Sequence, residues 1–203
     1  MKMLRKSLMM KATQLSYRNQ KKVLFSNLSF DTKKNPLIVI EGKNGSGKST
    51  LLKICLGLVK ASSGQVELSE RVGYVPDSSE PYFIGMSPQV FFQFLCVNLS
   101  LPESDFQQRL EDLRAKFSFH HQLMTTPIQS LSLGEKKKVM LMAAFLLDPP
   151  LYLMDEPFSG LDEQSLTYLS EKIKEELTKG KSFVIVTHGY QDYLSDTALM
   201  LQL

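Results

Sequence analysis

The stretch PLIVIEGKNGSGKSTLLKICLGLV, residues 36–59, decides the fold. It begins with the continuous apolar run Pro36–Ile40, which is the pattern of a strand buried on both faces. A glycine-rich turn follows, and apolar residues then recur at helical spacing from Ser49 to Val59. The sequence therefore predicts a strand, a loop and a helix in direct succession.

The loop of this unit, Gly42–Thr50, matches G-x-x-x-x-G-K-[ST] and lies between a strand and a helix, as that motif requires. Its glycines let backbone N–H groups turn toward phosphates, and the following helix points its positive end at the same place. We predict that Lys48 neutralises the β- and γ-phosphates of a nucleotide and that the Ser49 hydroxyl ligates Mg²⁺. The nucleotide-binding residues predicted here are Asn44, Gly45, Ser46, Gly47, Lys48, Ser49 and Thr50.

Outside this unit, buried strands alternate with helices, which predicts an α/β domain with a parallel sheet and right-handed crossovers. The other expected strands are Leu15–Tyr17, Val23–Phe30, Val66–Leu68, Val72–Val75, Leu151–Met154 and Phe183–Val186. An amphipathic helix is expected at Gln164–Thr178, ended by Gly180. Residues 77–145 contain no convincing strand, so we expect one domain, 1–203, with a core at about 1–76 and 146–203 and a helical insertion at about 77–145.

The composition is that of a soluble globular protein, with 43% hydrophobic and 22% charged residues. A net charge of +3 does not indicate direct binding of nucleic acid. Cys55 and Cys96 lie in apolar stretches without metal-ligand spacing, so we expect two buried free thiols in a reducing compartment. No window approaches the length of uncharged apolar sequence that spans a bilayer, so any membrane-spanning part must belong to another chain.

A second chemical signal is the apolar run from Leu151 that ends in Asp155 and Glu156. Asp155 can hold Mg²⁺ through its water shell, and Glu156 can polarise the water that attacks a γ-phosphate. Carboxylates at strand ends are common on protein surfaces, so the pair alone is weak evidence. Because it follows a phosphate loop, it indicates nucleotide hydrolysis.

A third signal is Leu131–Glu135, in which Ser132 and Glu135 have the spacing of a capping box. The simplest interpretation is the start of a helix. A helix start with a serine hydroxyl and the N–H of Gly134 is also an anion site. One protein cannot use two such sites on the same γ-phosphate unless a second copy supplies one of them.

Together these segments resemble the ATP-binding-cassette (ABC) ATPase family, and the resemblance covers almost the whole chain. Its motifs are the Walker A loop Gly42–Thr50, the signature Leu131–Glu135 in an LSxGE form, the Walker B end Met154–Pro157, the D-loop Ser159–Asp162 and the switch pair Thr187–His188. The resemblance implies a P-loop fold with a mostly parallel core sheet, an N-terminal antiparallel β portion and an inserted helical subdomain. It also implies ATP and Mg²⁺ as cofactors.

The resemblance further implies a role for each matched residue. Glu156 would be the catalytic base, and His188 would sense the γ-phosphate. Tyr17 lies upstream of the loop, where the family places an aromatic ring that stacks on adenine. The residues expected to act at a dimer interface are Ser132 and Gly134, which would reach the partner's ATP, and Asp162, which would cross the interface. A lone histidine or tyrosine is otherwise more often structural.

The sequence departs from the family at two places. Asp77 stands where the family has a glutamine that touches Mg²⁺ and the attacking water. An ionised aspartate can bind the metal's water shell but cannot donate a hydrogen bond, and it could instead start a loop or cap a helix. Lys136–Lys138 follow the signature; we expect a solvated charged face, with nearby acidic or phosphate partners as the alternative.

The implied function is the energy subunit of a transporter whose integral membrane permease is a separate chain. The expected subunit is a homodimer, cytoplasmic and peripheral on the inner face of the cell membrane, and the compact single cassette favours an exporter. The aromatic stretch Phe91–Phe94 would contact the permease or, more simply, form the core of the insertion. The alternatives are a soluble ABC ATPase and a P-loop kinase of small molecules, which lacks counterparts of Leu131–Glu135 and His188.

Overall fold

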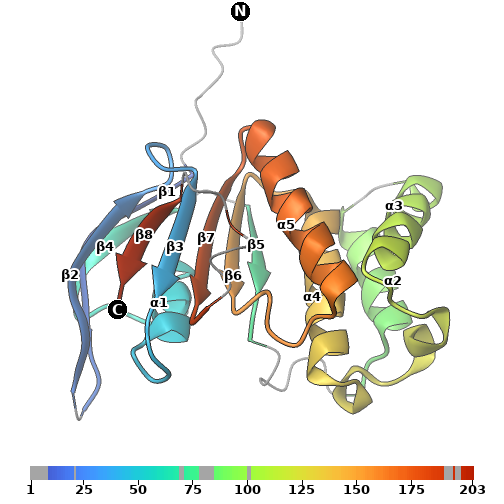
Figure 1. The fold of residues 1–203 in the computed structure, drawn as a ribbon, viewed down its shortest axis with the longest axis horizontal. Coiled ribbons are helices and arrows are strands. Elements are labelled where there is room, and N and C mark those ends of the chain that lie inside the picture. Colours follow the sequence, from blue (N-terminus) through green and yellow to red (C-terminus); the bar gives the residue numbers. More distant parts are fainter. Residues whose placement is uncertain are drawn as a thin grey trace, which may run out of the picture.

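The computed structural model describes residues 9–20, 22–68, 71–77, 85–99, 102–189, 194 and 198–203, and Figure 1 shows their arrangement. The strands are β1 (Met10–Arg18), β2 (Val23–Asp31), β3 (Leu37–Glu41), β4 (Ser63–Leu68), β5 (Val72–Val75), β6 (Leu151–Asp155), β7 (Ser182–Thr187) and β8 (Leu199–Gln202). The helices are α1 (Lys48–Cys55), α2 (Pro88–Leu99), α3 (Glu103–Lys116), α4 (Leu133–Leu147) and α5 (Glu163–Thr178), with 3-10 turns η1 (His121–Thr125) and η2 (Ile128–Ser130).

The central sheet has the strand order β5-β6-β7-β3-β8, and every neighbouring pair in it is parallel. The side chains of β3 alternate between two cores, since Leu37 and Val39 belong to one and Ile38 and Ile40 to the other. β6 and β7 are buried along their whole length in the same way. This confirms the predicted parallel sheet, because only a sheet covered on both faces explains such continuous apolar strands.

A second, antiparallel sheet with the order β2-β1-β4 lies beside the first, which confirms the expected N-terminal antiparallel portion. α1 packs in the core that this sheet shares with one face of the parallel sheet, through Leu51 and Leu52. β1 is longer than predicted. Register shifts between Ala12 and Tyr17 interrupt its alternation of apolar and polar residues, which hid the strand in the sequence.

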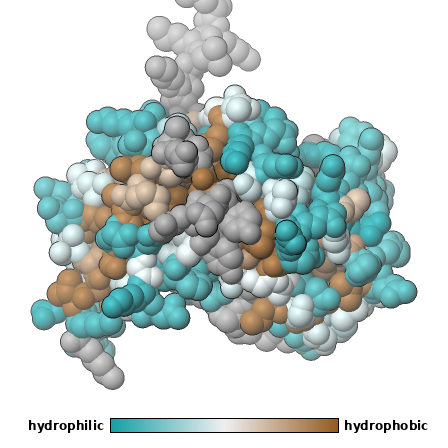
Figure 2. Space-filling model, in the orientation of Figure 1, coloured by the Kyte–Doolittle hydropathy of each residue, from teal (hydrophilic) through white to brown (hydrophobic). Residues whose placement is uncertain are grey.

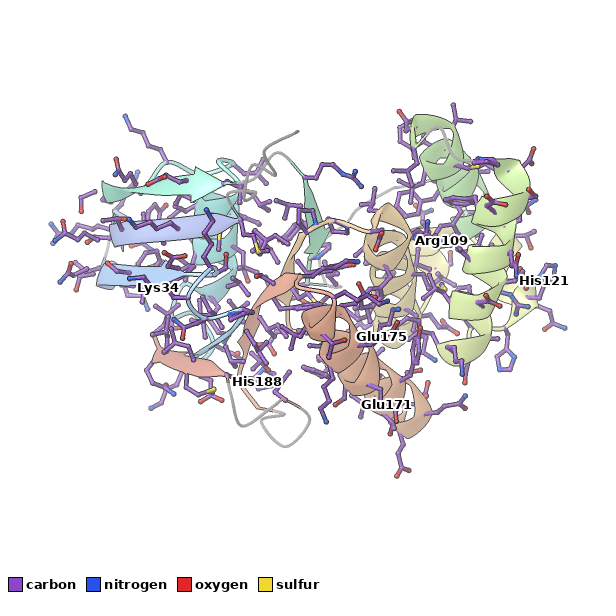
Figure 3. The ribbon with its side chains drawn as sticks, turned by 90° about the horizontal axis from the view of Figure 1, so that it is seen from above. Lys34, Arg109, His121, Glu171, Glu175 and His188 are labelled. Atoms are coloured by element: carbon purple, nitrogen blue, oxygen red, sulfur yellow. The ribbon has the colours of Figure 1, made fainter. Side chains whose placement is uncertain are left out.

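The other face of the parallel sheet is covered by α4 and α5, and beyond them lie α2 and α3 (Figure 1). Figure 3 shows Arg109 and His121 at this helical end of the molecule and Lys34 at the opposite end, among the strands. Phe91 and Phe92 are buried in the core of the helical part, whereas Phe94 is exposed. The aromatic stretch therefore mainly forms the core of the helical part.

Three details differ from the expectations. α1 ends at Cys55 rather than Val59, because Gly57 adopts a positive φ of 74° that stops the helix. Strand β8 had no strong pattern and was not predicted. Cys55 is buried as expected, but Cys96 is only partly buried.

Hydrophobic and hydrophilic residues are exposed in different regions of the surface. In the view of Figure 2, hydrophobic residues are exposed over the strands around β8, while α5 and α3 present mainly hydrophilic residues. Among the helices of the described residues, none combines the length and the apolar character that crossing a membrane requires.

Candidate nucleotide-binding and hydrolysis site

The predicted phosphate loop leaves β3 at Glu41 and enters α1 at Lys48. Gly47 caps the helix in a left-handed conformation, with φ of 107°. A Cβ at this position would lie 3.0 Å from the Cβ of Leu24 on β2. Both the backbone conformation and the close approach of β2 therefore require glycine here.

Lys48 turns its side chain back into the loop. Its Nζ donates to the carbonyl oxygen of Gly42 at 2.7 Å and lies 3.5 Å from Oε1 of Glu156. The side chain is only 7% exposed. The loop thus holds a nearly buried cation whose main partner is a neutral carbonyl, which a phosphate oxygen would outcompete because it is charged.

Glu156 follows β6 directly and has a positive φ of 46°. Its N–H donates to the carbonyl oxygen of Val186 on β7 at 2.9 Å, which fixes the turn. Oε2 accepts from the His188 N–H at 3.3 Å, and Nδ1 of His188 lies 2.8 Å away. The Thr187 hydroxyl shares its proton between Oε2, at 3.1 Å, and the Gly189 carbonyl oxygen, at 2.8 Å. The ends of β6 and β7 therefore hold this carboxylate in one orientation.

His188 lies at the end of β7 and its side chain is half exposed (Figure 3). Because Nδ1 faces a carboxylate, we assign the proton to Nδ1, where it donates to Glu156. Nε2 is then the ring nitrogen available to a ligand. Glu156, Lys48 and His188 thus meet at the ends of three adjacent strands, β6, β3 and β7.

Asp155 is almost completely buried, and its Oδ2 has no hydrogen-bond partner among the described residues. Burial raises the pKa of this carboxyl to about 6, although the Ser49 hydroxyl and the Lys137 ammonium act in the opposite direction. An orphaned buried carboxylate oxygen beside a serine hydroxyl fits Mg²⁺, which prefers oxygen ligands. Mg²⁺ usually keeps several waters and binds substrate phosphates, so these would complete the shell of an ion held by Ser49 and Asp155.

Asp77 follows β5, the strand next to β6 in the sheet. Because β5 and β6 are parallel, Asp77 and Asp155 lie at the same edge of the sheet, and the charge of Asp77 contributes to raising the pKa of Asp155. The fold thus places Asp77 where it can act on the predicted metal site. Its role in place of a glutamine stays a prediction.

The three lysines after the signature do not form the expected solvated face. Lys137 is completely buried, and its Nζ donates to the carbonyl oxygens of Pro76 and Asp155. Lys138 is nearly buried and forms an ion pair with Asp162. The expectation was wrong because the ends of β5 and β6 and the start of α5 pack against this side of α4, so the alternative of nearby acidic partners holds. Lys137 was not predicted as a site residue.

The predicted adenine-stacking residue, Tyr17, stacks on Phe25 with ring centroids 6.2 Å apart. Phe25 in turn lies against Gly47, where a Cβ would be 3.3 Å from its ring. Tyr17 is therefore one aromatic ring away from the phosphate loop. Lys22 on the same hairpin donates to the carbonyl oxygen of Gly45 at 3.2 Å. No sequence motif had pointed to Lys22.

The predicted capping box at the start of α4 is confirmed. The Ser132 hydroxyl accepts from the N–H of Glu135, and the Glu135 carboxylate accepts from the N–H of Ser132. Gly134 lies against the D-loop, since a Cβ there would meet the carbonyl oxygen of Gly160 at 2.1 Å. Leu133 is 57% exposed.

α1 and α4 lie on opposite sides of the parallel sheet (Figure 1). The structure therefore brings Asp155, Glu156 and His188 to the phosphate loop, and it places Asp77 at the same edge of the sheet as Asp155, but it does not bring Ser132 or Gly134 to that loop. That separation agrees with a second copy supplying the signature, which stays a prediction.

Comparison with known proteins gives a consistent result. The model of the ABC transporter family matches residues 25–159. The chain is 34% identical to the cytochrome c biogenesis ATP-binding export protein CcmA of Bartonella henselae, over 86% of this chain and 85% of the relative. It is 31% identical to the zinc import ATP-binding protein ZnuC of Hydrogenovibrio crunogenus, over 89% of this chain and 72% of the relative.

Two solved structures are similar to the fold. One is an ATP-binding subunit of an ABC transporter, with a TM-score of 0.75 and 26% identity over 89% of this chain and 79% of the other. The second is a dimeric bacterial ABC transporter cassette, with a TM-score of 0.72 and 20% identity over 96% of this chain and 94% of the other. The chain belongs to the ABC transporter family, as its ATP-binding cassette.

Proposed function

We propose that the chain binds and hydrolyses Mg-ATP as the ATPase subunit of a transporter. The observation that carries this proposal is the position of Glu156, which is bonded to Thr187 and His188 and lies 3.5 Å from the phosphate-loop lysine Lys48. A carboxylate fixed beside a phosphate site by its neighbours is suited to orient an attacking water.

The geometry supports an order of events on this chain's own residues. An arriving triphosphate replaces the Gly42 carbonyl as the partner of Lys48, and its charge weakens the attraction between Lys48 and Glu156. Oε1 of Glu156 is then free to accept a proton from the attacking water, while Oε2 stays held by Thr187 and His188. Ser49 and Asp155 would hold Mg²⁺, which neutralises charge on the phosphates when bound.

The site is proposed to act in a dimer of identical chains, in which the start of α4 from one copy faces the nucleotide of the other. Ser132 is exposed and Leu133 presents an apolar side chain to solvent beside it. An exposed leucine next to a helix N-terminus supports burial against a partner, because an interface would remove this large apolar side chain from water.

The transport partner is proposed to be a separate integral membrane permease, with this chain peripheral on the cytoplasmic face of the membrane. Three apolar residues of α2, Val90, Phe94 and Val97, are exposed at helical spacing and could contact such a chain. We favour an exporter because, of the two relatives compared above, the export protein has the higher identity to this chain. The match to the export protein also covers more of that relative's length than the match to the zinc importer does. A non-transport ABC ATPase is the alternative.

Glu156→Gln tests the proposal, with Glu171→Gln on the exposed face of α5 as the matched control. We expect the first variant to bind ATP, lose hydrolysis by at least about 100-fold and form a dimer in ATP, while the control behaves like the unaltered chain. Hydrolysis and mass in solution are measured together. Full activity in Glu156→Gln would show that Glu156 does not orient the attacking water. A variant that stays monomeric in saturating ATP would contradict the proposed homodimer.

The cellular role needs a separate measurement. We expect the full-length chain, purified from membranes in mild detergent, to bring down an integral membrane protein in stoichiometric amount. Replacing Phe94 by Glu should release that protein without changing ATP binding. ATP hydrolysis without any membrane partner, in a chain that stays in the soluble fraction, would favour the non-transport alternative.

A further inference from the structure

The first turns of α4 carry a lysine, Lys137, with no exposed surface. Its Nζ donates to the carbonyl oxygen of Pro76 at 2.9 Å and to that of Asp155 at 2.7 Å. These carbonyls stand at the ends of β5 and β6, which are neighbours in the sheet. One ammonium group therefore ties the signature helix to the two strand ends that carry Asp77 and Asp155.

The same sheet edge holds three carboxylates, Asp77, Asp155 and Glu156. Burial lowers the pKa of Lys137 to about 8, and these three carboxylates act against that effect, Asp77 most strongly. Lys48 approaches Glu156 from the phosphate loop, which is the side where a nucleotide would bind. Lys137 approaches the carboxylates from α4 instead, and its ammonium group is bonded to the carbonyl of Pro76, the residue before Asp77.

The buried charge of Lys137 can be explained by Asp77, the residue at which the sequence departs from the family. Where a neutral glutamine was expected, the chain has an additional carboxylate close to Asp155 and Glu156. A completely buried lysine is costly without acidic neighbours, and a carboxylate at the same sheet edge lowers that cost. The negative charge of Asp77 and the positive charge of Lys137 therefore stabilise each other.

We propose that Lys137 is a positioning residue that fixes the ends of β5 and β6 and compensates the carboxylate of Asp77, so that the two residues act as one unit. The pair keeps the Asp77 carboxylate in place beside the predicted Mg²⁺ site. Its effect on hydrolysis rests on the proposed ATPase function, whereas its effect on the stability of the nucleotide-free chain does not.

A double-mutant cycle tests the unit, with Lys137→Met, Asp77→Asn and the combination of both. Lys136→Met is the matched control, since Lys136 is a partly exposed neighbour on the same helix. The first readout is the midpoint of thermal unfolding in EDTA without nucleotide. The second is the rate of ATP hydrolysis as a function of Mg²⁺ concentration.

We expect Lys137→Met to lower the unfolding midpoint by roughly 5–10 °C, because it removes the cation near Asp77 and the donor to two carbonyls. Asp77→Asn in the same chain should recover at least half of that loss, and Lys136→Met should change the midpoint by less than about 2 °C. The double variant should also hydrolyse ATP faster than Lys137→Met at saturating Mg²⁺.

Equal losses from Lys137→Met in the unaltered chain and in the Asp77→Asn variant would overturn the proposal, since the two effects would then be independent. Lys137→Gln guards against a variant that fails to fold, because its amide group keeps N–H donors for the carbonyls without the charge. If Lys137→Gln matches the unaltered chain in both readouts, the charge is not needed and the proposal fails. Absence of hydrolysis in the unaltered chain would sink the ATPase function alone, because the thermal cycle does not depend on it.

Discussion

Gly134 and Gly160 are packed so closely that a methyl group on Gly134 would lie 2.1 Å from the Gly160 carbonyl oxygen. Gly134 opens the signature helix, and Gly160 belongs to the turn that precedes α5. A second link joins the same elements, since Lys138 on α4 is ion-paired with Asp162. The signature and the D-loop therefore form one connected surface within a single chain.

We predict that Gly134→Ala destabilises the chain by about 1–3 kcal/mol, because backbone rather than a flexible side chain occupies the space of the new methyl group. Urea denaturation measures the change. Gly189→Ala is the control, since its new methyl group would meet nothing within 4 Å. An unfolding free energy unchanged in Gly134→Ala would show that the D-loop moves aside freely.

Replacing Thr187 by Val should slow ATP hydrolysis by roughly 10-fold while ATP affinity stays the same, because the hydroxyl orients Glu156 and valine keeps the buried volume. Single-turnover hydrolysis and binding of a fluorescent ATP analogue separate the two quantities. A weaker affinity with an unchanged rate constant would assign Thr187 to binding instead.

The stability of the metal-free chain should depend on the pH through Asp155. The pKa of Asp155 is about 6 in the folded chain and 3.8 ordinarily, so between these values the folded chain keeps a proton that the unfolded chain has lost. The free energy of unfolding therefore falls as the pH rises through this window, by up to about 3 kcal/mol.

Denaturation of the unaltered chain and of Asp155→Asn in EDTA, at several pH values from about 4 to 7, isolates this contribution. The difference between the two should shift in favour of Asp155→Asn as the pH rises. A difference that stays constant with pH would mean that Asp155 ionises normally in the folded state.

Asp162 should show the opposite dependence. Partial burial alone would raise its pKa, but hydrogen bonds from Lys138 and Ser165 lower it to about 2. Its contribution is therefore complete above its ordinary pKa and is lost as the pH falls through about 2. Since the side chain is half exposed, Asp162→Ala should cost about 1 kcal/mol at neutral pH, mainly as a lost helix cap.

The free energy of unfolding is measured for the unaltered chain and for Asp162→Ala at a series of pH values from neutral downward, and the difference between the two is followed. Asp162→Asn is a useful companion, because it keeps an acceptor for the Ser165 N–H but removes the charge facing Lys138. A loss that is identical at acid and neutral pH would argue that the carboxylate charge contributes nothing.

The parallel sheet and the phosphate loop could be predicted because their signals are local. A continuous apolar run, a glycine turn and a helical repeat follow one another from Pro36 to Val59, and each has one physical interpretation. The capping box at Ser132 was equally readable, since its two hydrogen bonds join residues three apart. Strand β8 was not, because only its pairing with β3 makes it a strand.

The surroundings of charged residues were harder to predict. Lys136, Lys137 and Lys138 are identical in sequence, yet only Lys137 points to the ends of β5 and β6, which depends on how α4 packs on the sheet. Lys22 reaches Gly45 only because the β1–β2 hairpin folds over the phosphate loop. Contacts between distant segments leave no local pattern.

The place of β3 in the sheet has a consequence for how the chain is made. β3 carries the phosphate loop, but its neighbours on either side, β7 and β8, lie far downstream in the chain and are synthesised much later. Glu156 is likewise held by residues of β7. A growing chain therefore carries its phosphate-binding sequence long before it can hold a nucleotide, and that ability arises only after β7 and β8 have been made.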